Sequence, residues 1–469
     1  MKTYLIAMSL AAVLSAPACA GSRAELAPGL PPYGPDQPLP VPQITRQTLA
    51  NGLEVWVVPR EGLPRVDYVL AVRNAGYAAD APTMPAFADM LARLLTEGTA
   101  AHDARQIAEL AQGYGGALAA EADNDGLLLS GRALASHAAP MLDLLAEVVR
   151  TPDFPEAEVT LARANGLQAL RAAEAQPGFK ANRALLAATY GDHPYARTQA
   201  TEASIAAVTQ AMLKSEYARR FHPDRTLLVI TGRLDPQTGL AMARQAFGDW
   251  KTSGVKPPEP AAAPRQAEPH HVLIQRDGSV QSTLRIGSPA IAATDPDYVP
   301  LRMASTVLGG GFSSRVMQNL REDKGYTYGA RASLAASRVG GMVSAAADVR
   351  NEVTGPALGE FFKEFQRLGQ EAVPDQELTD NKRYVAGSYL ISNQLQAAVA
   401  QTLASNWLHG LPPEFLGQFV PRIRAVDAAQ VQAMARKYYD PARQSVIVVG
   451  DGKAVGEQLK EFATFKLQR

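Results

Sequence analysis

Two hydrophobic patterns follow each other along the chain. Short runs rich in β-branched and aromatic residues, such as residues 66–72, are typical of β-strands, and the apolar runs on both sides of Asn51-Gly52 predict a β-hairpin. Longer Ala-rich segments, such as 85–99 and 135–150, carry apolar residues at i, i+3, i+4 and i+7 and predict amphipathic helices. Strands followed by pairs of helices favour an α+β fold, with mostly antiparallel sheets and helices packed on one face of each.

Two Pro-rich stretches divide the chain into segments. Residues 21–44 are predicted to be extended, and residues 253–270 are predicted to be a linker between two halves of similar size. We therefore predict an N-terminal domain over 45–252 and a C-terminal domain over 271–469.

The two halves resemble each other at matching positions. Segments 221–234 and 439–452 both run aromatic, x, Pro, x, Arg, then a β-branched apolar run and a Gly, at a constant offset. Segments 153–159 and 372–378 are both Pro-led helix starts with acids in the first turn. A duplicated α+β domain is the simplest account of these matches.

The N-terminus has the composition of an export signal. Residues 1–20 contain one Lys, then an apolar run too short to span a bilayer, then a small-residue cleavage signal at Ala18-Cys19-Ala20. We expect cleavage after Ala20 and a periplasmic mature protein with no membrane span; lipidation of Cys19 is the less favoured alternative. The mature chain would have no cysteine, and hence neither a disulfide nor a thiolate metal ligand.

Charge excludes some partners. The 46 Lys and Arg residues balance the 46 Asp and Glu residues, so the formal net charge is +0. A neutral chain has no global field that would attract nucleic acid or an anionic membrane. We therefore expect partners to be recognised by shape and local chemistry.

The residues alone offer no complete catalytic site. No two of the seven histidines have the i, i+4 spacing of a helical zinc site, and no GxSxG nucleophile elbow occurs. The Gly-rich segment 308–316 lacks the Lys-Ser/Thr ending of a phosphate loop. It is either flexible backbone against which an extended chain could lie, or a plain turn that requires φ > 0.

Downstream of this segment, a helix is predicted to stop near Gly325. A strand then begins with Tyr326 and Tyr328 on one face, and Arg321 lies in the last helical turn. On generic grounds such an Arg is a solvated charge, and such a Tyr contributes packing.

Six segments together resemble the zinc peptidases of the pitrilysin family, M16, in the short two-domain type that includes mitochondrial processing peptidase. The resemblance covers nearly all of the chain after about residue 45. The segments that match the family are LANGLEVWVVP, RNAGYAAD, LLTEGT, GDHPYARTQATEASIAAVT, LGGGFSSRV and LREDKGYTYGA.

The resemblance implies that the metal site is degenerate. Zinc-binding members of the family have HxxEH on the helix before the EGT-like turn, and here Asp89 and Arg93 occupy the two His positions while Ala92 replaces the Glu. A third ligand, a Glu on a later helix, is matched by Gln168 or Ala169. We expect no metal or other cofactor in this chain, and an Asp89–Arg93 ion pair in the vacated pocket.

The resemblance also implies a retained part of the site. In this family an Arg and a Tyr seven residues apart bind the substrate carbonyl, and here Arg321 and Tyr328 match both type and spacing. Substrate is further expected to lie against the Gly-rich segment, at Gly309, Gly310, Gly311 and Phe312.

These matches lead to two hypotheses. The favoured one is the non-zinc-binding subunit of a heterodimeric peptidase, inactive alone, whose zinc-bearing M16 partner cleaves short or unfolded peptides. The alternative is a non-catalytic binding or scaffold protein of the same fold, like the core subunits of respiratory complexes.

Overall fold

The computed structural model describes residues 42–251 and 254–468. The predicted export signal, Cys19 and most of the Pro-rich segment 21–44 therefore lie outside the described residues. No helix in the described ranges has the length and hydropathy needed to cross a bilayer.

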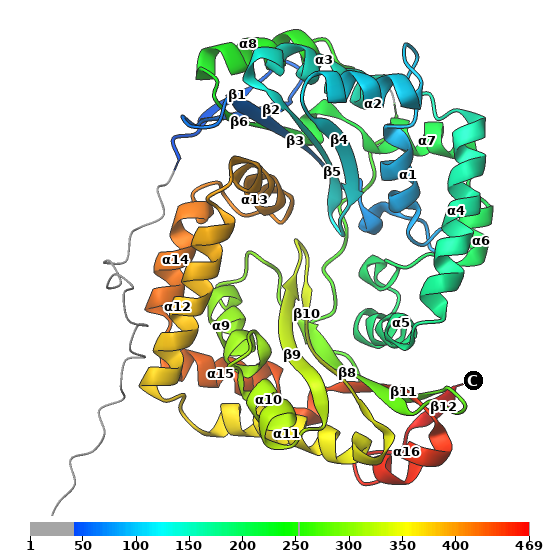
Figure 1. The fold of residues 1–469 in the computed structure, drawn as a ribbon, viewed down its shortest axis with the longest axis vertical. Helices are drawn as coiled ribbons and strands as arrows, with labels where there is room; N and C mark the ends of the chain where they lie inside the picture. The colour runs from blue at the N-terminus through cyan, green and yellow to red at the C-terminus, as the bar shows by residue number, and fades with distance from the viewer. Residues whose placement is uncertain (1–41, 252–253, 469) are drawn as a thin grey trace, which may run out of the picture. The chain divides into compact units, whose positions relative to one another are not determined.

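The first half of the described chain is built around a six-stranded sheet (Figure 1). The predicted hairpin at Asn51-Gly52 is confirmed: Thr48 pairs with Glu54 across a turn in which Gly52 has φ +91°. The strands are β1 (Thr45–Thr48), β2 (Glu54–Pro59), β3 (Arg65–Arg73), β4 (Ala117–Ala122), β5 (Gly126–Leu134) and β6 (Thr226–Gly232). The helices are α1 (Phe87–Leu95), α2 (Ala104–Gly113), α3 (Ala138–Arg150), α4 (Glu156–Glu174), α5 (Pro177–Tyr190), α6 (Glu202–Ala206), α7 (Gln210–Arg220) and α8 (Pro236–Phe247).

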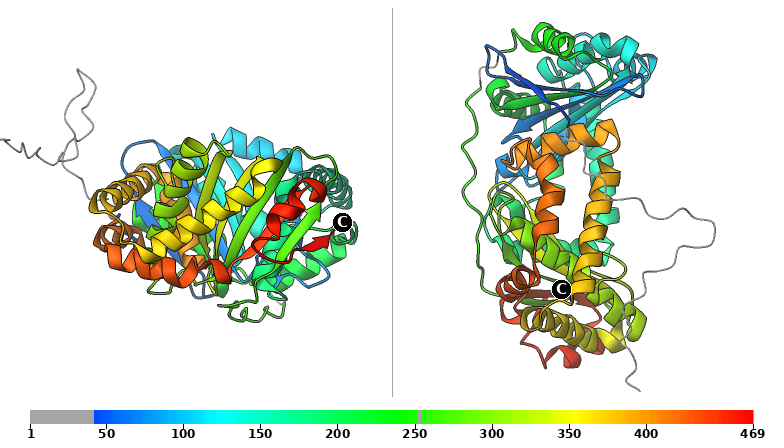
Figure 2. Two further views of the ribbon diagram at one scale, coloured as in Figure 1. Left: turned by 90° about the horizontal axis from the view of Figure 1, so that it is seen from below. Right: turned by 90° about the vertical axis from the view of Figure 1, so that its left-hand side faces the viewer.

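The second half contains another six-stranded sheet. Its strands are β7 (His271–Gln275), β8 (Gln281–Ala290), β9 (Thr327–Ala336), β10 (Gly341–Arg350), β11 (Ser445–Gly450) and β12 (Lys466–Gln468). Its helices are α9 (Tyr298–Gly309), α10 (Arg315–Met317), α11 (Thr354–Gln370), α12 (Asp375–Ser392), α13 (Gln396–Leu408), α14 (Phe415–Ala425), α15 (Ala428–Tyr438) and α16 (Gly452–Leu459). A π-helical turn, Gln318–Asp323, continues α10. Helices α12 and α14 lie side by side, as the views in Figure 1 and Figure 2 agree.

The two sheets share one topology over five strands and differ at one edge, where β1 is antiparallel to β2 and β12 is parallel to β7. Their orders are β1-β2-β6-β3-β5-β4 and β12-β7-β11-β8-β10-β9. In each sheet an early strand pairs in parallel with the last long strand (β2 with β6, β7 with β11), and the next three pairs are antiparallel. This match supports the duplication that the sequence predicted, and the mixed α+β class with mostly antiparallel sheets is confirmed.

Helices also start at equivalent positions in the two halves. The predicted Pro-led starts are those of α4 and α12, where Pro155 and Pro374 are the N-cap residues. A Pro with its fixed φ suits the start of a helix because it has no N–H to leave unpaired. The starts of α4 and α12 (Glu156, Asp375) and those of α5 and α13 (Pro177, Gln396) are both separated by 219 residues.

The halves exchange one helix each. On β3, Tyr68 donates to the carbonyl of Ala138 at the start of α3, whereas Asp67 accepts from Gln396 at the start of α13. Consecutive strand residues point to opposite faces, so α13 covers the face of the first sheet opposite α3. In return, α5 packs on β7, β8 and β11 of the second sheet, where Ala181 and Leu185 join a buried apolar cluster. Each sheet therefore has helices of its own half on one face and a helix of the other half on the opposite face. The predicted domain boundaries, 45–252 and 271–469, stay a prediction.

Candidate functional site

Helix α1, which carries the positions of the family's zinc motif, is fixed to the core by its apolar side. Phe87, Leu91 and Leu95 are buried, whereas Asp89 and Arg93 lie one turn apart on the exposed side. The helix begins after Ala86, which has φ +57°, and the carboxylate of Asp80 accepts the N–H of Ala88 at 3.2 Å. The position of α1 therefore follows from its hydrophobic spacing and from an acid at its N-terminus.

The predicted ion pair between Asp89 and Arg93 is wrong. Instead, the phenol of Tyr77 donates to Oδ1 of Asp89 at 2.7 Å. The surrounding protein partly desolvates the carboxylate and raises the pKa of Asp89, and the Tyr77 hydrogen bond and the charge of Arg93 only partly oppose this. The charge of Arg93 lowers the pKa of Asp89 without an ion pair between the two side chains. Tyr77, twelve residues upstream, binds the carboxylate instead.

The residues around α1 do not fit zinc. Ala92 is buried and offers no ligand atom, Arg93 is a cation, and Gln168 and Ala169 lie exposed on α4. Zinc sites in proteins are built from converging imidazole, thiolate or carboxylate groups. Along 42–251 and 254–468, the one group of three such side chains with ligand atoms within 4.8 Å of one another is elsewhere: Asp123, Asp125 and His409.

The predicted Arg and Tyr pair does come together. The guanidinium carbon of Arg321 lies 4.4 Å from the ring centroid of Phe312 and 4.6 Å from that of Tyr328. Phe312 is 63% exposed and Tyr328 is 86% exposed, so this aromatic stack is open to solvent. Cation–π contact orients the guanidinium, while the Tyr328 hydroxyl has no hydrogen-bond partner within the described chain. The stack can offer a guanidinium and a phenol to one carbonyl oxygen.

The backbone around Arg321 is irregular. The N–H of Lys324 bonds to the carbonyl of Asn319 at 3.0 Å, which is the i to i−5 pattern of a π-helix. The turn ends at Gly325 with φ +63°, and the N–H of Tyr326 reaches Leu320 at 2.8 Å. The predicted stop at Gly325 is thus present, and the bonds from Lys324 and Tyr326 span five and six residues instead of the four of an α-helix. Short π-helical turns of this kind occur frequently at functional sites.

Tyr326 does not share the surroundings of Tyr328. It packs against the apolar core of the second half, because β9 begins only at Thr327 and the left-handed Gly325 redirects the chain before it. The predicted common face for the two tyrosines is therefore wrong, and Tyr328 alone joins the stack with Arg321.

The Gly-rich segment is not a left-handed turn. Neither Gly309, Gly310 nor Gly311 has a positive φ. A Cβ on Gly309 would lie 2.0 Å from the backbone nitrogen of Ala332 on β9, and one on Gly310 would lie 2.7 Å from Cα of Thr306. Gly309 lets the end of α9 pack directly against β9, whereas Gly310 lets the chain leave the helix close to Thr306. β9 carries Tyr328, and Phe312, which follows the three glycines, contacts Arg321. The packing of α9 on β9 therefore positions both aromatic rings of the stack.

A polar network, which was not predicted from the sequence, joins the two halves. Asp125, between β4 and β5, accepts from the phenol of Tyr195 and from the backbone N–H of Arg338, and Arg338 in turn donates to Asn74 at 2.9 Å. Residues of this network are separated by up to 264 positions, so no local signal indicated it.

His409 at the end of α13 adds an ion pair to this network, 3.6 Å from Asp123. Burial alone would lower the pKa of His409, but the hydrogen bond and the charge of Asp123 raise it overall. Asp123, Asp125 and His409 are thus committed to contacts within the protein.

Comparison with known proteins gives one family. The model described as "Insulinase (Peptidase family M16)" matches residues 66–202, and the model described as "Peptidase M16 inactive domain" matches residues 207–385. In sequence the chain is similar to an uncharacterized zinc protease of Mycobacterium leprae, with 29% identity over 302 residues, 62% of this chain and 66% of that protein. It is also similar to a non-peptidase homolog of Helicobacter pylori, with 22% identity over 414 residues, 87% of this chain and 95% of that protein.

Solved structures agree with these matches. The fold is similar to that of a peptidase M16 inactive domain from Pseudomonas fluorescens, with a TM-score of 0.82, 26% identity, and coverage of 87% of this chain and 98% of that one. Two family models that together cover most of the chain, and a structural match over nearly its whole described length, lead to one conclusion: the chain belongs to peptidase family M16.

Proposed function

We propose that the protein is the zinc-free subunit of an exported heterodimeric peptidase, to which it contributes Arg321 and Tyr328. The observation that carries the proposal is the exposed stack of Phe312, Arg321 and Tyr328, in which a phenol without a partner stands beside a fixed guanidinium. The residues around α1, which do not fit zinc, support the need for a second chain. A zinc-bearing M16 homologue would supply the metal-activated water, and the export signal predicted from the sequence supports a periplasmic location for the pair.

In this role the two side chains stabilise charge. As water adds to a peptide carbonyl, negative charge grows on the carbonyl oxygen, and preformed donors aimed at it lower the barrier. Arg321 supplies a permanent positive charge with N–H donors, and Tyr328 supplies an O–H donor. The aromatic contacts hold the guanidinium plane, and Nε lies 3.2 Å from Oε1 of Glu322, so the terminal Nη groups remain available to the substrate.

The test uses the reconstituted pair of chains. Tyr328→Phe should lower kcat for a quenched peptide about 10²-fold, with size-exclusion chromatography showing unchanged assembly. Arg321→Lys should retain part of the activity that Arg321→Ala loses, since lysine keeps the charge but not the planar stack. Tyr326→Phe is the matched control, because Tyr326 lies two residues away and packs against the core outside the stack, and this variant should turn over like the wild type.

The second candidate is a non-catalytic binding or scaffold protein of the same fold. It is favoured by the similarity to the Helicobacter pylori protein described as a non-peptidase homolog. Unchanged turnover in both the Arg321 and the Tyr328 variants, or no zinc-bearing partner in affinity purification from the native cell, would select this candidate.

A further inference from the structure

The π-helical turn that carries Arg321 is held from behind by two acids of α11. Asn319, in this turn, is 7% exposed, and its Nδ2 donates to Glu360 at 2.8 Å and to Glu364 at 2.9 Å. Glu360 and Glu364 are four residues apart, so both carboxylates approach the turn from one side of α11. An amide NH2 group has two N–H donors, and Asn319 can therefore satisfy one acceptor on each acid.

Glu360 also contacts the other end of the turn. Its Oε1 lies 3.7 Å from Nζ of Lys324, while its Oε2 accepts from Asn319. Burial alone would raise the pKa of Glu360, but the hydrogen bond from Asn319 and the charges of Lys363 and Lys324 lower it overall. The N–H of Lys324 also bonds to the carbonyl of Asn319 at 3.0 Å. This backbone bond and the Glu360 carboxylate therefore close the same span of chain, and Arg321 lies inside it.

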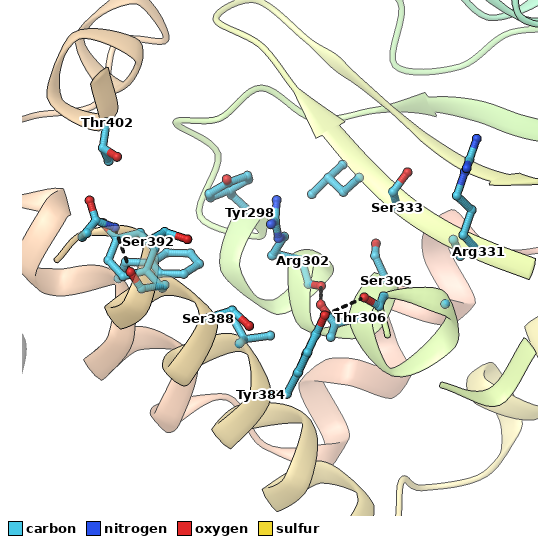
Figure 3. A pocket seen from close by; sticks show the side chains of 18 of the residues that line it. Tyr298, Arg302, Ser305, Thr306, Arg331, Ser333, Tyr384, Ser388, Ser392 and Thr402 are labelled. Carbon is cyan, nitrogen blue, oxygen red and sulfur yellow. Dashed lines mark hydrogen bonds between the residues drawn. The ribbon is translucent and has the colours of Figure 1, made fainter. Parts of the chain in front are cut away.

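The chain before the turn is braced by α12. Arg315 of α10 is 7% exposed and donates to both carboxylate oxygens of Glu377, at 2.8 and 2.9 Å. Seven residues further along α12, the hydroxyl of Tyr384 lies 3.5 Å from the carbonyl oxygen of Gly310, and Figure 3 shows this side chain rising from α12 toward Thr306 on α9. Residues seven apart lie on one side of a helix. One side of α12 therefore supports both the glycine segment and the start of α10, and the turn itself is left to Asn319.

The direction of the Arg321 side chain depends on the hydrogen-bond pattern of the turn. A helix turns by about 100° per residue, so a slip of one residue from the π-helical to the α-helical pattern would point Arg321 away from the two aromatic rings. The cation–π contacts alone oppose such a slip weakly, because Phe312 is 63% exposed and Tyr328 is 86% exposed. Hydrogen bonds from a buried amide to carboxylates are stronger. The contacts of Asn319 are therefore the main restraint on the turn.

We propose that Asn319 is a positioning residue for Arg321. Its side chain, bound by Glu360 and Glu364, keeps the turn in the π-helical pattern and thereby holds the guanidinium against the two aromatic rings of the stack. The use of this geometry on a substrate rests on the proposed function, whereas the geometry itself does not. The geometry and its use are therefore tested separately.

The geometry is tested on the chain alone by fluorine NMR, with p-fluorophenylalanine incorporated at position 312. The ring at this position contacts Arg321 and is exposed, so its resonance reports on the guanidinium and the label has room. Arg321→Ala gives the chemical shift of the ring without the guanidinium, and Asn319→Ala should move the resonance toward that value. Glu360→Ala should move it less far in the same direction, because Asn319 keeps its bond to Glu364.

The use of the geometry is tested in the reconstituted pair. Asn319→Ala should lower kcat roughly 10- to 100-fold, because a small misplacement of a catalytic group is costly. In the Arg321→Ala background the same change should have little further effect, since the residue that it positions is gone. Glu360→Gln keeps an acceptor for Asn319 and should retain turnover that Glu360→Ala loses. Lys363→Ala is the matched control: Lys363 pairs with Glu360 at 3.2 Å but lies outside the turn, so both the resonance and kcat should stay at the wild-type values.

Two results would overturn the inference: a fluorine resonance of Asn319→Ala that stays at the wild-type position, or a loss of turnover that is as large in the Arg321→Ala background as in the wild type. Thermal unfolding checks that each variant is folded, and Glu360→Ala gives the same two readings if Asn319→Ala is not. Failure of the inference is separable from failure of the proposed function. A resonance that moves while the reconstituted pair never cleaves refutes the peptidase role alone. Turnover that depends on Arg321 but not on Asn319 refutes the positioning role alone.

Discussion

Replacement of Arg220 by Met should be among the most destabilising single changes in the first half. The Arg220 side chain is 1% exposed and its guanidinium lies 2.9 Å from the carboxylate of Asp80, which is fully buried. It also contacts Glu216 at 2.7 Å and donates to the carbonyl of Ala75 at 3.0 Å. Because Asp80 also accepts the N–H of Ala88, the defect should extend to α1.

The magnitude follows from the charge that would remain. Removing one member of a buried ion pair typically costs about 3–5 kcal/mol, because the other charge is left without compensation. Arg219 is the matched control: it is adjacent on the same helix, also pairs with Glu216, and is 30% exposed. Arg219→Met should therefore cost about 1 kcal/mol or less.

The size of the effect should depend on pH. Burial raises the pKa of Asp80 to about 6, although Arg220 and the Ala88 N–H oppose this shift. Since the folded pKa is above the unfolded one, the contribution of Asp80 to stability is largest at low pH and is lost as the pH rises through about 6. Without Arg220 the pKa rises further and the loss continues to higher pH. The defect of Arg220→Met should thus be larger at about pH 8 than at about pH 5.

Urea unfolding at both pH values is a suitable assay, because the buried Trp56 and Trp250 report on the first half by fluorescence. A double-mutant cycle with Asp80→Asn should give a coupling energy of about 0.5–3 kcal/mol between positions 80 and 220. The reasoning is refuted if Arg220→Met costs no more than Arg219→Met, or if its cost does not change with pH.

Three further predictions concern the packing of β9, the joint between the halves and the metal. Gly309→Ala should lower the free energy of unfolding by about 1–3 kcal/mol and weaken the activity of the reconstituted pair, since its Cβ would meet Ala332 at 2.0 Å; Gly329→Ala, with open space around it, should be nearly neutral in urea unfolding. The ion pair of His409, whose pKa is raised, should stabilise the wild type fully below the ordinary histidine pKa near 6.5, and this contribution should fall as the pH rises. His409→Gln should remove this pH dependence of the free energy of unfolding. The same pH dependence in the variant would contradict the role of His409. The chain purified alone should contain well under one zinc per chain by elemental analysis, and stoichiometric zinc that survives chelator would contradict the degenerate site.

Much of the fold could be predicted from local pattern. Asn51-Gly52 fixed the first hairpin because the turn needs a residue that tolerates a positive φ. The spacing of Phe87, Leu91 and Leu95 indicated α1, and the two Pro-led segments predicted where α4 and α12 begin. These features depend on neighbours within a few residues, which a single sequence contains.

The parts that could not be predicted depend on partners far along the chain. Asp89 and Arg93 have the right spacing for an ion pair, but Tyr77 competes for the carboxylate from a separate turn. The role of Gly309 became clear only with β9 beside it, since its constraint is a close approach and not a backbone angle.

The crossing of α5 and α13 has a consequence for how such a chain can arise or be divided. A polypeptide of half the length with this topology would leave one face of its sheet bare unless a second copy supplied the missing helix. Two such copies donating helices to each other would form a twofold-symmetric pair, and a link between their ends would give the present arrangement. Cutting the chain between its halves should for the same reason yield two fragments that fold well only when both are present.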